Sequence, residues 1–293
     1  MKWIQIIILI LSASYTYGQM PKENELLNLY DSFSEEAGDA ILDWGFSALV
    51  RYDGKLILFD GGSSADILQQ NEKALGLDLT KVDIAILSHS HPDHISGFDY
   101  LLKINPEVEL FFPFDRFIGA HTSDNTGEAE KKRKYQRWYR FRDANINFVK
   151  ENTQIAPGIA LIPTISSLVG RFSKYPPYDK EPQFIGLSEL SLALQTKNKE
   201  WTLIVGCSHS QVEEIVRETK KYVKNNVTGV AGGFHLLPYS SDYISDIANM
   251  MKKDLQVNWV APGHCTGNSA HKIFKALYQD NYKYFGLGSR IKY

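Results

Sequence analysis

The chain has 293 residues, of which 43% are hydrophobic and 23% are charged, and these proportions are ordinary for a globular protein. Its formal net charge of −2 at pH 7 gives no global attraction to nucleic acid or to an anionic membrane surface, so neither is expected as a partner. The length suits one large domain or two small ones.

Residues 1–18 have the layout of a secretory signal peptide. Lys2 precedes an apolar stretch that runs from residue 3 to about residue 13, and small and polar residues follow up to Gly18. Because this stretch is short for a membrane span, we expect cleavage near Gly18 and a periplasmic or secreted mature chain, 19–293, without stable membrane association. An uncleaved membrane anchor is the alternative.

Strand and helix patterns alternate along the mature chain. Residues 46–51 and 55–59 predict a hairpin around the turn Asp53-Gly54, and residues 82–87 form an apolar run typical of a buried strand. The other expected elements are helices at 65–75, 97–104, 212–224 and 243–253 and strands at 189–195, 201–205, 227–230 and 257–260.

The middle of the chain, about residues 113–186, is less regular and is expected to hold a lid or substrate-loop insertion. Residues 126–143 are highly charged with aromatics at helical spacing, and residues 170–184 contain two prolines between tyrosines and predict an extended loop. Long aromatic loops in a compact domain are often lids or substrate walls, and ordinary surface packing is the alternative. Arg171, Lys174 and Tyr178 in this loop could hold an anionic group.

Three of the eight histidines lie within six residues, in His89-Ser90-His91-Pro92-Asp93-His94, directly after the buried strand. Residues two apart in an extended segment point to the same side, so His89 and His91 can present two imidazoles to one cation. Asp93 and His94 lie where the chain turns and suit a second metal ion, as in dinuclear hydrolytic sites. In the competing interpretation Asp93 only caps the next helix and the histidines are surface residues.

Four apolar strands each end in a turn that contains glycine or histidine. Because functional residues gather at the carboxyl ends of strands in α/β sheets, we expect one convergent site. Its candidate residues are His89, His91, Asp93, His94, Cys207, His209, His235 and His264.

Cys207 and Cys265 each lie within two residues of a histidine. A disulfide is the default for a pair of cysteines in an exported chain, but thiols beside imidazoles are also metal-site residues, so both interpretations stay open. A Cys-His nucleophile at Cys207 and His209 is a further alternative, which the histidine loop makes unnecessary.

Several segments resemble those of the metallo-β-lactamase fold superfamily. Residues 88–94 are similar to its HxHxDH signature, and residues 58–62, Leu-Phe-Asp-Gly-Gly, look like its strand-Asp-x-Gly element. The segments Gly-Cys-Ser-His, Gly-Gly-Phe-His-Leu and Gly-His-Cys-Thr-Gly are similar to one branch, which includes the dihydropterin ribofuranosyl-aminobenzene phosphate synthases. The resemblance covers about residues 46–288. It implies an α/β (α+β) fold, a four-layer αββα sandwich of two mixed sheets flanked by helices, with metals at one edge.

The same resemblance implies roles for the residues in these motifs. His89 and His91 match ligands of a first metal, and the ligands of a second metal are matched by Asp93, His94 and His264. Asp60 matches a residue that orients a ligating histidine.

The third histidine of the first metal is expected to be His209 rather than His121, because its motif places it beside Cys207. Many relatives carry a bridging aspartate where this chain has Cys207. Because a thiolate can bind one ion rather than bridge two, the site is expected to hold either one ion or two ions of unequal affinity. His235 is open between substrate contact, metal contact and a hydrogen bond in the pocket, and His271 is expected to be structural.

The resemblance thus implies a metal-dependent hydrolase that acts on an ester, lactone or phosphate ester of a small molecule. Zinc, as one or two ions, is the expected cofactor, with manganese or iron as alternatives, and metal-bound hydroxide would be the nucleophile. Asp93 is the candidate catalytic residue, as a proton acceptor or by orienting water. A transferase acting on an activated phosphoribosyl compound and a metal- or ligand-binding protein without turnover are the alternatives. Export counts against the transferase, because pterin biosynthesis is intracellular. The sequence indicates no oligomeric state.

Overall fold

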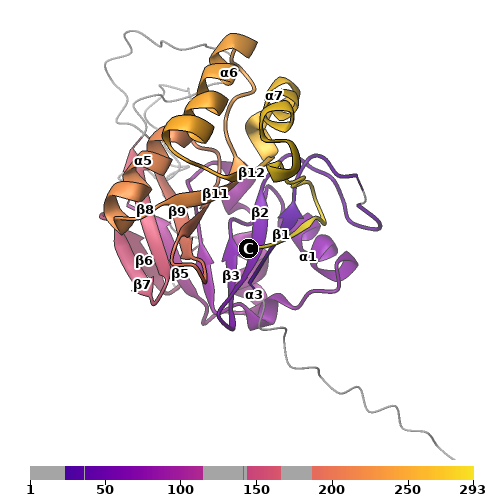
Figure 1. The fold of residues 1–293 in the computed structure, drawn as a ribbon. Coiled ribbons are helices and arrows are strands. Elements are labelled where there is room, and N and C mark those ends of the chain that lie inside the picture. Colours follow the sequence, from indigo (N-terminus) through magenta and orange to yellow (C-terminus); the bar gives the residue numbers. More distant parts are fainter. Residues whose placement is uncertain (1–23, 36, 115–140, 142–143, 166–186) are drawn as a thin grey trace, which may run out of the picture.

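Two mixed sheets face each other in the computed structural model, which describes residues 24–35, 37–114, 141, 144–165 and 187–293 (Figure 1). The first sheet has the order β13 (Arg290–Lys292), β1 (Glu25–Tyr30), β2 (Ser47–Tyr52), β3 (Lys55–Phe59), β4 (Ile84–Ile86), β5 (Glu109–Pro113) and β6 (Ile146–Val149). The second has the order β12 (Trp259–Gly263), β11 (Val227–Gly233), β10 (Trp201–Val205), β9 (Ser188–Gln195), β8 (Ile159–Ile165) and β7 (Thr153–Ala156).

Each sheet combines parallel and antiparallel pairs. In the first, β3, β4, β5 and β6 are parallel and the β1, β2, β3 and β13 pairs are antiparallel. In the second, β10, β11 and β12 are parallel and the remaining pairs are antiparallel. The carboxyl ends of parallel strands meet at one edge of a sheet, which brings the turns after these strands together.

Helices cover the outer faces of both sheets (Figure 1). Beside the first sheet lie α1 (Ala65–Ala74), the short α2 (Pro92–Ile95), α3 (Phe98–Ile104) and the 3₁₀ turn η1 (Leu79–Lys81). Beside the second lie α5 (Val212–Val223), α6 (Ser241–Asn249) with the π-helical turn η2 (Met250–Asp254), α7 (Asn268–Tyr278) and the 3₁₀ turns η3 (His264–Thr266) and η4 (Gln279–Asn281). The expected four-layer αββα sandwich of two mixed sheets is confirmed.

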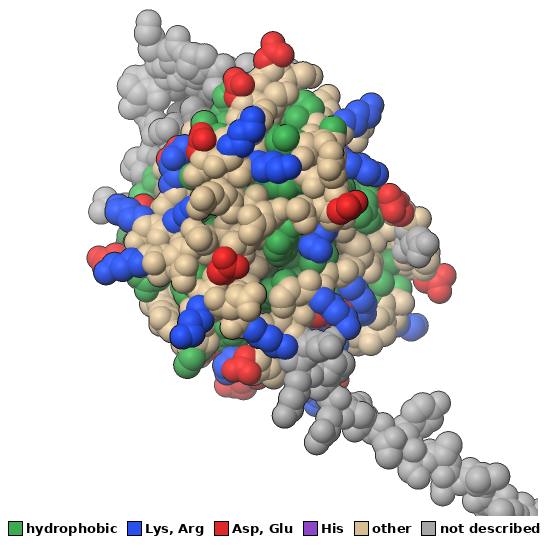
Figure 2. Space-filling view, viewed as in Figure 1, with side chains coloured by type: hydrophobic (Ala, Val, Ile, Leu, Met, Phe, Trp, Pro, Cys, Tyr) green, Lys and Arg blue, Asp and Glu red, His purple; other side chains and the backbone are tan. Residues whose placement is uncertain are grey.

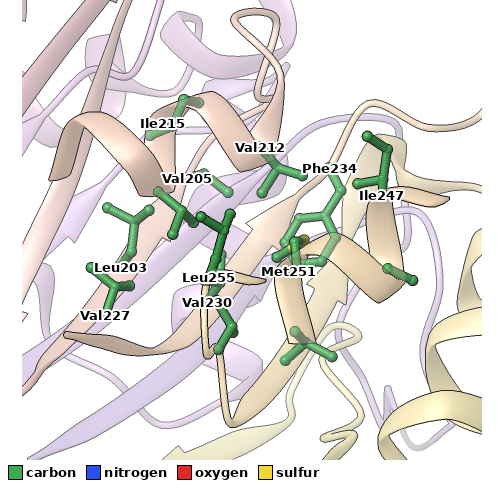
Figure 3. Packing of buried hydrophobic residues seen from close by; sticks show 14 of the residues in the cluster. Leu203, Val205, Val212, Ile215, Val227, Val230, Phe234, Ile247, Met251 and Leu255 are labelled. Atoms are coloured by element: carbon green, nitrogen blue, oxygen red, sulfur yellow. The ribbon is translucent and has the colours of Figure 1, made fainter. Parts of the chain in front are cut away.

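Three hydrophobic clusters fill the spaces between the four layers. Alternate residues of a strand enter different clusters: Leu203 and Val205 face the helices, whereas Ile204 between them faces the other sheet. Such double burial explains why these strands are nearly continuous apolar runs. Figure 3 shows the cluster between the second sheet and its helices; the labelled members are Leu203, Val205, Val212, Ile215, Val227, Val230, Phe234, Ile247, Met251 and Leu255.

The predicted elements agree with the structure except at some ends. Asp53 and Gly54 both have a positive φ, as the two-residue turn of the expected hairpin requires. The strand expected at 227–230 continues to Gly233, because Gly232 and Gly233 pair with β12. The helix expected at 243–253 changes to a π-helical turn after Asn249.

Some sequence-based expectations lie outside the described residues: the signal peptide at 1–18, His121, the loop at 170–184 and all of segment 126–143 except Phe141. The described part of the expected insertion holds β6, β7 and β8, which belong to the two sheets. Among the helices of the described ranges, none has the length and apolar character needed to cross a membrane. On the face drawn in Figure 2, Lys and Arg side chains are interspersed with Asp and Glu.

Candidate metal centre

Three imidazoles meet above the ends of β4 and β10. The ligand atoms of His89, His91 and His209 all lie within 4.8 Å of one another, and we call these residues the three-histidine set. His89 Nε2 is 3.0 Å from His91 Nδ1, and the His209 ring centroid is 4.8 Å from each of the other two. His89 and His209 are buried and His91 is half-buried. The structure therefore places His209 beside His89 and His91, as expected for a third histidine of that group.

A second group, the aspartate set, consists of Asp93, His94 and His264, whose ligand atoms also lie within 4.8 Å of one another. Asp93 Oδ2 is 3.8 Å from His94 Nε2 and 3.5 Å from His264 Nε2. Both imidazoles are completely buried, whereas the Asp93 side chain is 20% exposed. Asp93 thus gives the aspartate set its contact with solvent.

Cys207 lies between the two sets. Its Sγ is 3.2 Å from His94 Nε2. It groups with His89 and His94 on one side and with His264 and Cys265 on the other, with ligand atoms within 4.8 Å in each group. Both cysteines are buried, and both are free thiols in the structure.

Asp60 follows β3 and anchors two of the histidines. Its Oδ2 lies 2.7 Å from His94 Nδ1, and its carboxylate accepts hydrogen bonds from the Ser88 backbone N–H and the Ser88 hydroxyl, both at 2.6 Å. Ser88 Oγ in turn lies 2.9 Å from His89 Nδ1. Holding Nδ1 of both rings leaves Nε2 of His94 and His89 directed into the cluster, as expected of a residue that orients metal ligands.

Two further buried carboxylates hold the later histidines through the backbone. Glu189 accepts hydrogen bonds from the N–H groups of His209 and Ser210, both at 2.8 Å. Asp31 Oδ2 accepts the His264 N–H at 3.0 Å. The roles of Glu189, Asp31 and Ser88 were not predicted from the sequence. The adjacency of Ser88 to the histidine motif and the isolated acids within apolar strand patterns were the available signals.

The backbone around the site is tightly constrained. Asp60, Ser208, His235 and His264 have φ values of 61°, 64°, 50° and 46°, in the left-handed region that non-glycine residues rarely adopt. Such conformations tend to cluster at functional sites. Before Cys207 the chain needs glycine, because a Cβ at Gly206 would collide with the Ser88 hydroxyl.

The two remaining histidines of interest lie outside the two sets. The His235 ring centroid is 4.3 Å from that of His209, and its side chain is largely buried. His271 lies on α7, where its Nδ1 is 2.9 Å from the Tyr282 hydroxyl. His235 therefore borders the centre, whereas His271 belongs to the neighbouring helix surface.

The electrostatics suit a cation. Burial, together with the surrounding imidazoles, lowers the pKa of His89 and His209 well below the usual value, so their lone pairs are available at neutral pH. Burial opposes ionisation of Asp93, but His94 and His264 outweigh it and hold the pKa of Asp93 well below its usual range.

His264 gives an independent test of fit. Burial disfavours its charged form, yet Cys265 and Asp93 raise its pKa to about 9. Among the described residues, neither of its ring nitrogens has a hydrogen-bond partner, although the ring is fully buried. At that pKa the ring is a cation at neutral pH, held 3.5 Å from the Asp93 carboxylate, so a metal ion bound there would take the place of the ring proton. A buried imidazole beside a carboxylate and a thiol fits such a ligand.

Comparison with known proteins gives related sequences along most of the chain. The model of the metallo-beta-lactamase superfamily matches residues 45–183. Uncharacterized protein MJ0448 of Methanocaldococcus jannaschii is 28% identical over 256 residues, which cover 84% of this chain and 92% of that protein. The 7,8-dihydropterin-6-methyl-4-(beta-D-ribofuranosyl)-aminobenzene-5'-phosphate synthase of the same organism is 29% identical over 273 residues, covering 85% of this chain and 90% of the synthase.

Solved structures share the fold. Tm1679, described as a metal-dependent hydrolase of the beta-lactamase superfamily, has a TM-score of 0.69 at 24% identity and covers 92% of this chain and 99% of its own. A diphosphatase from the PhnP family has a TM-score of 0.55 at 14% identity and covers 92% of this chain and 97% of its own. The histidine motif, the two-sheet sandwich and the sequence matches agree in their likeness to the metallo-beta-lactamase superfamily, whose model matches residues 45–183.

Proposed function

We propose that the protein is a metal-dependent hydrolase that acts on a small-molecule ester, lactone or phosphate ester. The observation that carries the proposal is the pair of adjacent ligand sets at one edge of the sandwich, His89, His91 and His209 beside Asp93, His94 and His264. The likeness to Tm1679, a metal-dependent hydrolase with the same fold, supports it.

The two sets would hold the metal, and a divalent cation bound there supplies Lewis acidity toward a substrate oxygen and acidifies water. Asp93, the aspartate-set member whose side chain reaches solvent, accepts a hydrogen bond from an entering water at Oδ2 and orients it. The buried imidazoles and the aromatic ring of Phe46, 6.1 Å from that of His264, exclude bulk water from behind the site.

Zinc is the proposed metal, with one or two ions per chain and with manganese or iron as alternatives. Imidazole and thiol ligands suit zinc, whereas oxygen-rich sites suit magnesium or calcium. Cys207 makes the neighbourhood of the aspartate set softer than a carboxylate would. His235 would contact the substrate or the metal from the side of His209.

Export is part of the proposal and depends on residues 1–18 acting as a cleaved signal peptide. Expression of the full chain in a bacterium with a periplasm, followed by fractionation and N-terminal sequencing, tests it. A mature chain that begins at Gln19 in the periplasm or the medium supports export, and an intact chain in the cytoplasm contradicts it.

The hydrolase proposal is tested with the zinc-loaded protein and a panel of esters, lactones, phosphodiesters and β-lactams. Hydrolysis that disappears with chelation and in the variant His89→Ala/His91→Ala supports the proposal. Activity that survives in that variant contradicts the metal mechanism, and no turnover in the whole panel favours a metal- or ligand-binding role.

A synthase or transferase is the second candidate, because the similar synthase aligns over 90% of its own length. The name of that synthase describes a product that joins a dihydropterin to a phosphorylated ribofuranosyl-aminobenzene. Incubation with an activated phosphoribosyl compound and a ring-bearing acceptor, read by mass spectrometry, separates the two functions. A condensation product without hydrolysis of the panel would favour the second candidate.

A further inference from the structure

A cavity of about 670 Å³ lies beside the metal centre, and we call it the α7 cavity. Phe33 and Trp44, from the loop between β1 and β2, form part of its wall, and Tyr284 adds a third aromatic residue from the C-terminal segment. His264, a member of the aspartate set, also lines it. The cavity and the candidate metal centre therefore share one residue.

The wall of the cavity that lies closest to the metal centre is aromatic. The Trp44 ring centroid is 5.0 Å from that of His264, and Trp44 is 41% exposed. Phe33 packs edge-on against Tyr284, with ring centroids 5.8 Å apart. Large apolar side chains that stay exposed in a concave surface are typical of ligand-binding sites.

The part of the lining that α7 contributes carries positive charge. Asn268, His271, Lys272 and Lys275 follow the spacing i, i+3, i+4 and i+7, so they share one face of α7. The other face of the helix packs into the core through Ala270, Phe274 and Tyr278. Burial lowers the pKa of His271 to about 4, so the two exposed lysines supply the charge at neutral pH.

Among the described residues that line the cavity, one is acidic, Glu35, and two are lysines, Lys272 and Lys275. The balance favours an anion over a cation. Because both lysines are exposed, they would bind the anion at the mouth of the cavity, whereas the aromatic wall is adjacent to His264. Phe33 contacts both groups of residues, because its ring centroid is 5.2 Å from that of His271 on α7, so charged and aromatic side chains lie side by side in the same cavity.

Trp44 lies between the cavity and the metal centre, since it lines the cavity and its ring centroid is 5.0 Å from that of His264. The next residues of the loop run past Asp93: a Cβ at Gly45 would contact the Asp93 carbonyl oxygen, and the Phe46 N–H donates to that oxygen at 3.1 Å. The loop that carries Trp44 is thus fixed against the backbone of Asp93, whose side chain is 20% exposed, so Trp44 is the cavity residue nearest to the accessible part of the aspartate set that these contacts identify.

We propose that the α7 cavity binds the non-reacting part of the substrate, and that this part is a planar aromatic group bearing an anion such as a carboxylate or a phosphate. The ring packs against Trp44, Lys272 and Lys275 bind the anion, and the ester, lactone or phosphate-ester bond is directed toward Asp93. This substrate class rests on the proposed hydrolase function and makes that function more specific.

The test uses two probes of equal shape, naphthalene-2-sulfonate and the neutral naphthalene-2-sulfonamide, titrated calorimetrically into the full mature chain. We expect the sulfonate to bind more tightly than the sulfonamide. Trp44→Ala should weaken both probes by about tenfold, since it removes the stacking surface. Lys272→Gln/Lys275→Gln should weaken the sulfonate by about fivefold and leave the sulfonamide nearly unchanged.

Two matched variants control for nonspecific effects. Leu42→Ala removes a side chain of the same loop that is 45% exposed and outside the cavity lining, and Lys253→Gln removes an exposed lysine of η2. Neither should change the affinity for either probe. Equal affinity for both probes, no binding at all, or equal weakening by the controls would overturn the proposal.

Kinetics separate this inference from the proposed function. For an anionic aryl ester, if the wild type hydrolyses it, KM should rise in the lysine and Trp44 variants while kcat stays within about twofold. If these variants hydrolyse the ester with an unchanged KM, the proposed role of the cavity is contradicted and the hydrolase function is supported. Probe binding that depends on Trp44 and the lysines, in a protein without hydrolytic turnover, would keep the cavity as a site and remove the hydrolase.

Discussion

The three-histidine set and the aspartate set both take ligands from the loop at residues 89–94, but they differ in ligand chemistry and in the residues that hold the ligands by hydrogen bonds. The first holds imidazoles alone, and its later member, His209, is fixed by Glu189 on its backbone N–H. The second combines a carboxylate with imidazoles and has the Cys207 thiol against His94. Asp60 touches His94 directly and reaches His89 only through Ser88. The two sets should therefore respond differently to single substitutions.

The largest effect is expected from His89→Ala/His91→Ala, which removes two of the three imidazoles in the three-histidine set. Metal affinity of the three-histidine set should fall by more than about 100-fold, because loss of a residue that only hydrogen-bonds a metal ligand already lowers metal affinity by about 10- to 100-fold. Elemental analysis of the dialysed protein measures the metal that is lost. The aspartate set should retain part of its metal in this variant. His271→Ala is the matched control, and unchanged metal content in the double variant would contradict the assignment.

Asp60→Asn should weaken metal binding by about 10- to 100-fold, mainly at the aspartate set, because it alters the group that holds His94 Nδ1. Asp83→Asn is a suitable control: Asp83 also accepts a backbone N–H, from Leu56, but precedes β4 instead of following β3. Competition with a chromophoric chelator gives both affinities. Equal weakening at both sets would show that the path through Ser88 matters as much as the direct contact.

The fold and the local half of the site could be predicted from the sequence. The histidine loop lies within one short segment after a buried strand, so the extended and helical backbone already determines which side chains converge. The hairpin at Asp53-Gly54 is equally local, since two residues with positive φ decide it.

The anchoring residues could not be predicted in the same way. Glu189 and Asp31 act through backbone N–H groups of residues 20 and 233 positions away, and such contacts exist only after the sheets pair. The Lys and aromatic walls of the α7 cavity likewise come from segments that the first sheet and α7 bring together. Sequence periodicity shows that such residues are buried or exposed, but not what they face.

Cys207→Ser tests whether the thiol makes the sets unequal. In the cobalt-substituted protein, thiolate ligation gives a near-ultraviolet charge-transfer band, which should be absent in Cys207→Ser and present in Cys265→Ser. Affinity for the second ion should fall by about tenfold, because the hydroxyl is a weaker ligand for zinc and cobalt than a thiolate. A charge-transfer band that is present in Cys207→Ser and absent in Cys265→Ser would show that Cys265, and not Cys207, is the metal ligand.

Glu189→Gln should give the smallest effect and should act on the three-histidine set alone. Burial raises the pKa of Glu189 from 4.5 to about 7, so its contribution to stability is present below the unfolded pKa and is lost as the pH rises through about 7. Where Glu189 is neutral, the carboxylic acid and the amide each offer one carbonyl oxygen to the N–H groups of His209 and Ser210, so the substitution changes little there. In urea unfolding of the metal-free protein, wild type and variant should therefore be about equally stable at about pH 4, and the wild type should lose stability relative to the variant as the pH rises to about 8. Parallel stability curves would mean that Glu189 is ionised throughout this range, in which case it would hold His209 as a permanent carboxylate.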